Sequence, residues 1–132
     1  MGVPNRLSKE GEPIMQELSD VPEANDSSEE ISFEIIASAG QARSLAFEAL
    51  GYARSNDFVR ARELIEESKK EILVAHKCQT RLLTQEASGN HVDVDVLLVH
   101  AQDHLMTAQL ARELIEEIIN LYETKADKEV DS

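Results

Sequence analysis

The chain has 132 residues, and its composition limits both its fold and its partners. Hydrophobic residues make up 42% but aromatic residues only 4%, so a core must be built from aliphatic side chains and alanine, which favours packed helices over a β-sandwich or barrel. The formal net charge is -13, which argues against nucleic acid and anionic membrane surfaces as partners, because both bind clustered lysine and arginine. The single cysteine, Cys78, cannot form an internal disulfide, which is typical of a reducing compartment.

The first 30 residues differ from the rest of the chain. They carry nearly half of the excess of acidic residues, a net charge of -6 out of -13, and all three prolines, at positions 4, 13 and 22. Few apolar residues among many charges cannot offset the entropy of ordering, so we expect residues 1–30 to be an acidic, disordered and mainly solvating arm. No stretch approaches the ~20 apolar residues of a membrane span, and no signal sequence is evident, so we expect a soluble, cytoplasmic protein without direct membrane insertion.

Three later segments show helical periodicity. Apolar residues recur at spacings of three and four over about 31–53, 58–86 and 96–124. Helix-cap and turn residues separate these segments at 51–57 and 87–91. The sequence therefore predicts an all-α domain over 31–124, an antiparallel up-down-up three-helix bundle, followed by a polar C-terminal tail at 125–132.

The third predicted helix has two apolar faces. At about 100° per residue, one face gathers the residues expected to join the core: Leu98, Ala101, Leu105, Ala108, Ile115 and Ile119. Roughly opposite lie Val96, Thr107, Leu110, Leu114 and Leu121, with Asp103 among them and His100 at the edge. A lone three-helix bundle needs one apolar face per helix, so the second face predicts self-association around a symmetry axis.

The same helix places two histidines one turn apart, His100 and His104, around Asp103. A zinc hydrolase is disfavoured because Ala101 stands where the His-Glu-x-x-His motif has its glutamate. The histidines could simply be hydrogen-bonded near an interface. Alternatively, a neutral imidazole nitrogen could accept a phosphoryl group, with His104 assisting. The sequence has no phosphate-binding loop or kinase signature, so the phosphate would come from another protein.

Four segments resemble one protein family in order and spacing: 38–46, 57–58, 75–80 and, most specifically, 98–107. They are similar to the lactose/cellobiose (chitobiose) class of IIA component of the bacterial phosphoenolpyruvate-dependent sugar phosphotransferase system. The resemblance covers about residues 30–124 and implies a homotrimer of three-helix bundles.

The resemblance also implies roles for individual residues. His100 would be the phosphoryl acceptor, taking phosphate from the histidine-containing phosphocarrier protein. It would pass the phosphate to a cysteine of the cognate IIB component during import of a lactose-, cellobiose- or chitobiose-type sugar. Asp103 would be the metal ligand, one per subunit around a divalent cation, with oxygen ligands favouring Mg²⁺. The alternative is a non-catalytic helical oligomer acting as an adaptor or regulator.

Other residues are given plainer interpretations. We interpret His76 and Cys78 as structural and leave Arg43 and Gln102 outside the site. Several glutamates of the second and third predicted helices are interpreted as solvated: Glu63, Glu66, Glu67, Glu113, Glu116 and Glu117.

Overall fold

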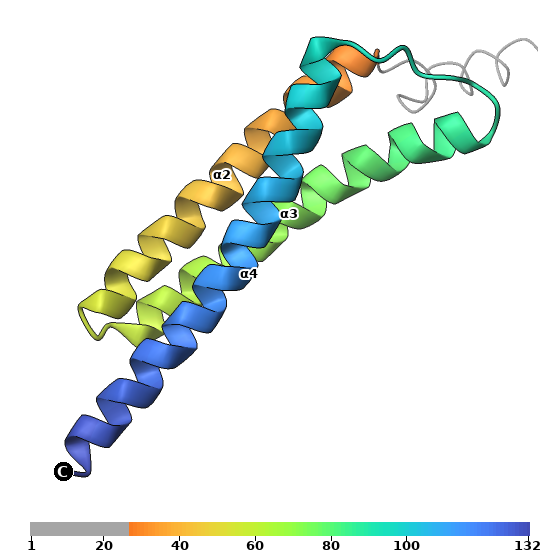
Figure 1. Cartoon of the computed structure of the whole chain (residues 1–132). Coiled ribbons are helices and arrows are strands. Elements are labelled where there is room, and N and C mark those ends of the chain that lie inside the picture. The colour runs from red at the N-terminus through yellow and green to blue at the C-terminus, as the bar shows by residue number, and fades with distance from the viewer. Residues whose placement is uncertain (1–26) are drawn as a thin grey trace, which may run out of the picture.

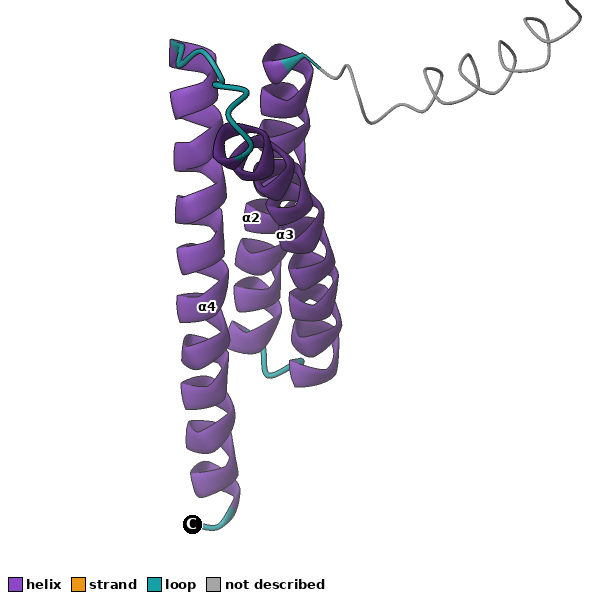
Figure 2. Ribbon diagram, turned by 90° about the vertical axis from the view of Figure 1, so that its right-hand side faces the viewer, coloured by secondary structure: helices purple, strands orange, loops and turns teal. Residues whose placement is uncertain are grey.

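The computed structural model describes residues 27–132, and their regular structure is three helices (Figure 1). These are α2 (Ser28–Arg54), α3 (Phe58–Ala87) and α4 (Val96–Val130). Consecutive helices run in opposite directions, so α2 and α4 are parallel to each other and α3 is antiparallel to both (Figure 2). The predicted all-α, up-down-up bundle is thus confirmed, while most of the predicted acidic arm lies outside the described residues.

Side-chain caps set the start of each helix. The side chains of Ser27, Asp57 and Asp95 each accept a hydrogen bond from the backbone N–H three residues later, which satisfies a donor that the first turn leaves unpaired. In the turn between α3 and α4, Gly89 has a φ of 91°, a conformation that L side chains rarely adopt.

Two helix boundaries differ from the predicted ones. Helix α2 begins at Ser28, inside the predicted arm, because Ser27 caps it and acidic Glu29 and Glu30 occupy its first turn. Helix α4 continues to Val130, so most of the predicted tail is helical. The apolar periodicity fades after residue 124, but the segment contains Ala, Lys and Glu, which favour helix, and its Lys125 and Glu129 form an i,i+4 ion pair.

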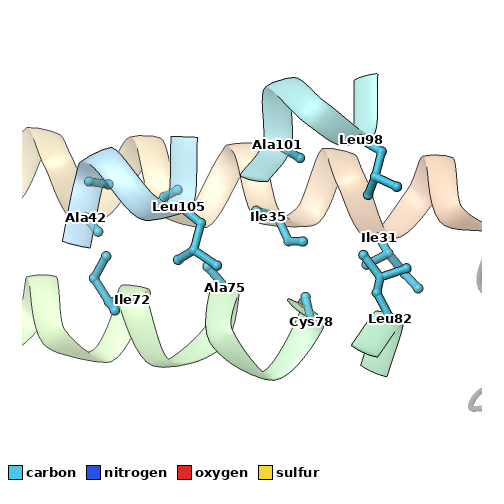
Figure 3. Close-up of a cluster of buried hydrophobic side chains, with 12 residues drawn as sticks. Ile31, Ile35, Ala42, Ile72, Ala75, Cys78, Leu82, Leu98, Ala101 and Leu105 are labelled. Carbon is cyan, nitrogen blue, oxygen red and sulfur yellow. The ribbon is translucent and has the colours of Figure 1, made fainter. Parts of the chain in front are cut away.

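The core is built from a narrow alanine stripe on α2. Ala39, Ala42, Ala46 and Ala49 are fully buried, and small side chains let neighbouring helices approach closely. The buried Ser68 hydroxyl of α3 donates to the Ala42 carbonyl oxygen at 2.6 Å, which shows how near the two backbones come. Figure 3 shows aliphatic side chains of all three helices meeting in the part of the core that lies near the start of α2 and α4. Leu98 lies beside Ile31 there.

Helices α3 and α4 meet partly through polar side chains. Contacts repeat at seven-residue steps along both antiparallel helices. They pair Arg62 with Glu123 at 2.7 Å, Lys69 with Glu116 at 2.9 Å and His76 with Gln109 at 2.7 Å. We call these three pairs the polar ladder. One more pair, Gln79 and Gln102, adjoins it at 2.6 Å.

Glu116 corrects one prediction from the sequence. It is not a solvated residue but a half-buried one that also accepts a hydrogen bond from Arg112 at 2.7 Å. Burial opposes its ionisation, yet Lys69 and Arg112 outweigh that effect and lower the pKa of Glu116. Glu116 thus joins α3 and α4 as a paired carboxylate.

The bundle leaves much of α4 uncovered. Its C-terminal turns extend beyond the turn that joins α2 and α3 (Figures 1 and 2). The buried residues of α4 and its polar-ladder residues face α2 and α3, and most of the rest of its surface is exposed. No helix in residues 27–132 has the length and apolar character needed to cross a membrane.

Candidate functional site on the outer face of α4

The outer face of α4 is apolar and exposed, as the sequence predicts. Its aliphatic residues include Leu110 and Leu114, each 55% exposed, Leu121, 69% exposed, and Val96, 86% exposed. On the opposite side of the same helix, Ala101, Leu105 and Ile119 are fully buried. Leu110, Leu114, Leu121 and Val96 therefore form a second apolar surface, which the single chain leaves in contact with water.

His100 lies on this outer face, and the helix brings His104 against it. The two Nε2 atoms are 3.0 Å apart, and the rings are nearly perpendicular, with centroids 4.5 Å apart and an interplanar angle of 83°. At this distance one Nε2 carries a proton and donates it, while the other accepts with its lone pair. The pair thus holds one neutral imidazole nitrogen with a hydrogen-bond donor beside it.

The two histidines differ in access. His100 is exposed, whereas His104 is half-buried. An imidazole nitrogen is a nucleophile in its neutral form, and a protein that delivers an electrophilic group must reach it from outside. The geometry therefore suits His100 as the reacting group and His104 as the residue that orients it.

Asp103 occupies the same face, about one turn after His100 and directly before His104 in the sequence. It is exposed, and its carboxylate has no hydrogen-bond or ion-pair partner within residues 27–132. Its backbone carbonyl accepts a hydrogen bond from the Thr107 hydroxyl at 2.6 Å. No group of three or more His, Cys, Asp or Glu side chains in the described part of the chain is placed to hold a metal ion, so any cation at Asp103 needs ligands from outside residues 27–132.

The remaining candidate residues have structural contacts. His76 belongs to the polar ladder, and Gln102 is held by Gln79, away from His100. Cys78 is buried; this burial raises the pKa of its thiol, and a hydrogen bond from Arg81 at 3.3 Å offsets the effect only in part. Cys78 is therefore a core residue rather than a reactive thiol.

Two features of the structure were not predicted from the sequence: a contact between an arginine and an aromatic ring on the surface, and the polar ladder. The Arg43 guanidinium lies over the ring of exposed Phe47, 5.5 Å from its centroid. For the ladder, the signal was present: positions 62, 69 and 76 follow a seven-residue spacing that places them on one side of a helix.

Comparison with known proteins gives matches over most of the chain. Residues 30–123 match the family described as the lactose/cellobiose-specific IIA subunit of the PTS system. The N,N'-diacetylchitobiose-specific EIIA component of Escherichia coli is 42% identical over 112 residues, which cover 83% of this chain and 97% of that protein.

Two solved structures show the same fold. The cellobiose-specific enzyme IIA of Bacillus anthracis has a TM-score of 0.76 and 41% identity, covering 79% of this chain and 95% of that one. The IIA(Chitobiose)–HPr complex of the Escherichia coli phosphotransferase system gives a TM-score of 0.68 and 42% identity, covering 77% of this chain and 99% of that one.

Proposed function

Because this chain belongs to the lactose/cellobiose-specific IIA family of the sugar phosphotransferase system, we propose that His100 is its phosphoryl acceptor. His100 receives the group from HPr, the histidine-containing phosphocarrier protein, and passes it to a cysteine of the cognate IIB component. The observation that carries this assignment is the exposed His100 ring with the Nε2 of His104 at 3.0 Å. The solved HPr complex of a 42% identical relative supports HPr as the donor.

The transfer needs only the two imidazoles and the incoming group. The lone pair of the neutral His100 ring attacks phosphorus, the phosphorus–nitrogen bond to the donor histidine breaks, and the donor ring leaves with that electron pair. Phosphorylation adds oxygens that accept hydrogen bonds, and the Nε2–H of His104 is placed to donate to one of them. In the second step the IIB thiolate attacks phosphorus and the His100 ring is the leaving group.

The working form that we propose is a homotrimer. The exposed outer face of α4, with Leu110, Leu114 and Leu121, needs a partner, and a copy of the same face around a threefold axis supplies one. Packing α4 helices on an axis would bring three Asp103 carboxylates together. Their mutual repulsion calls for a divalent cation, and an all-oxygen ligand set fits Mg²⁺.

The proposed pathway places the chain in the cytoplasm. The transported sugar would be of the lactose, cellobiose or chitobiose type, as in the relatives' names. Because His100 exchanges phosphate only with proteins, this chain need not contact the sugar, whose selection falls to the membrane component.

Mass spectrometry tests the assignment. The protein is incubated with phosphoenolpyruvate, the upstream kinase and HPr, and the intact mass is measured. We expect an acid-labile, base-stable gain of about 80 Da, one phosphoryl group, which His100→Ala abolishes. His91→Ala is the matched control, since this exposed loop histidine lies outside the site. An unlabelled wild-type protein would instead favour a non-catalytic helical oligomer that serves as an adaptor or regulator, and equal labelling of His100→Ala would overturn His100 as the acceptor.

A further inference from the structure

The outward side of α3 carries a basic and apolar strip in a strongly acidic chain. Five residues at helical spacing form it, and we call them the α3 strip: Lys70, Leu73, Val74, Lys77 and Arg81. All five are exposed, Leu73 by 55% and Val74 by 40%. Lysines that flank exposed aliphatic side chains form a surface suited to an acidic segment with apolar residues of its own.

The charges of the strip are mostly unpaired. Lys70 and Lys77 have no ion pair or hydrogen bond through their ammonium groups within residues 27–132. Arg81 donates to Glu34 of α2 at 2.9 Å. This contact shows that the first turns of α2 lie against the C-terminal half of α3. Ile31 of α2 and Leu82 of α3 belong to one core cluster, which also places these two parts of the helices together (Figure 3).

The chain enters the described structure at this same place. Ser27 caps α2 one turn before Ile31, so residues 1–26 join the bundle close to Arg81. Within them, the segment 10–26 contains six carboxylates and the apolar residues Ile14, Met15, Leu18 and Val21. Ile14, Leu18 and Val21 follow a spacing of four and three, which in a helix would place them on one side, with Glu17 and Asp20 adjacent in sequence to this set.

We propose that the acidic segment 10–26 binds the α3 strip of its own chain. Its aliphatic residues cover Leu73 and Val74, and its carboxylates pair with Lys70 and Lys77. Segment 10–26 is long enough to cover the strip. The strip is about 16 Å long from Arg81 to Lys70, and 17 residues span that length in either helical or extended form. The covalent tether raises the effective concentration to about the millimolar range, so weak ion pairs suffice.

Zero-length carbodiimide crosslinking of the full-length wild-type protein tests the proposal. This reagent joins a lysine to a carboxylate only when the two are in contact. We expect crosslinked peptides that join Lys70 or Lys77 to segment 10–26, with a yield that falls several-fold in about 0.5 M salt, where screening is strong. Lys128, exposed at the far end of α4 and without a partner in the described residues, is the matched control lysine.

Two further experiments identify what binds the α3 strip. In a mixture of ¹⁴N- and ¹⁵N-labelled chains, we expect crosslinked peptides of a single isotope; pairs of mixed isotope would assign the strip to another copy and overturn the proposal. Leu73→Ser with Val74→Ser keeps both lysines and changes only exposed side chains. This double variant should lower the yield of the crosslinked peptides several-fold. An unchanged yield in this variant, or as much crosslinking to Lys128 as to Lys77, would also overturn the proposal.

Discussion

Truncation of Leu114 gives a quantitative test of self-association through the outer face of α4. This side chain is 55% exposed in the single chain, and full burial of a leucine contributes about 2.5 kcal/mol. Covering the exposed part is therefore worth about 1.4 kcal/mol per subunit, of which Leu114→Ala forfeits about 1 kcal/mol because Cβ remains. Over three subunits the loss is about 3 kcal/mol, or roughly a hundredfold in the trimer dissociation constant.

Sedimentation equilibrium over a range of concentrations measures this change. Leu73→Ala is a close control, because Leu73 is also 55% exposed but lies on α3. Because the dissociation constant of a trimer scales with the square of the concentration, we expect the trimer of Leu114→Ala to dissociate at roughly tenfold higher concentration than wild type, and Leu73→Ala to behave as wild type. If Leu114→Ala left the dissociation constant unchanged, or if both variants weakened assembly equally, the outer face of α4 would not be the subunit interface.

Three further predictions concern single side chains. His104→Ala should still be phosphorylated on His100, but about a hundredfold more slowly, because one preorganised donor is lost; stopped-flow or quench-flow labelling measures the rate, and an unchanged rate would remove His104 from the site. Asp103→Leu should keep or strengthen the trimer and abolish its dependence on divalent cations, as seen by sedimentation with and without a chelator; a dissociated variant would contradict this. Glu116→Gln should lower the free energy of unfolding by about 1–2 kcal/mol at pH 7, measured with urea. Because the folded pKa of Glu116 lies below 4.5, this difference should persist above pH 4.5 and shrink as the pH falls through the folded value; a difference that grew in acid would refute the pairing.

Periodicity and capping made most of the fold predictable from the sequence. Alanine at alternating spacings of three and four marks a buried helix face, and the observed core of α2 follows it through Ala39, Ala42 and Ala46. The caps were predictable to within a choice between two residues, Asn56 or Asp57 and Asp93 or Asp95, because a short polar side chain just before an apolar period satisfies the first free N–H groups. The structure has Asp57 and Asp95 in these positions.

The polar ladder could not be assigned in the same way. Lysine, arginine and glutamate on a helix surface usually face water, and hydropathy does not tell whether a facing helix carries complementary partners. Lys69 and Glu116 pair only because α3 and α4 run antiparallel in one register, which is a property of the tertiary structure. The site shows the same division: the spacing of His100 and His104 predicts that they meet, whereas the proposed surroundings of Asp103 depend on other copies of the chain, which one sequence does not place.

The three different sides of α4 would allow one helix to serve both stability and the proposed transfer. Its buried side anchors it to α2 through Leu98, Ala101 and Leu105, and the polar ladder fixes its register against α3. The outer side makes no packing contact with the other helices of residues 27–132. A phosphoryl acceptor must be exposed to two visiting proteins yet held in one orientation, because transfer is fast only when the reacting atoms are already aligned. As the proposed acceptor, His100 would meet both demands, since it projects from the exposed side of a helix whose other sides are held, and its ring contacts that of His104.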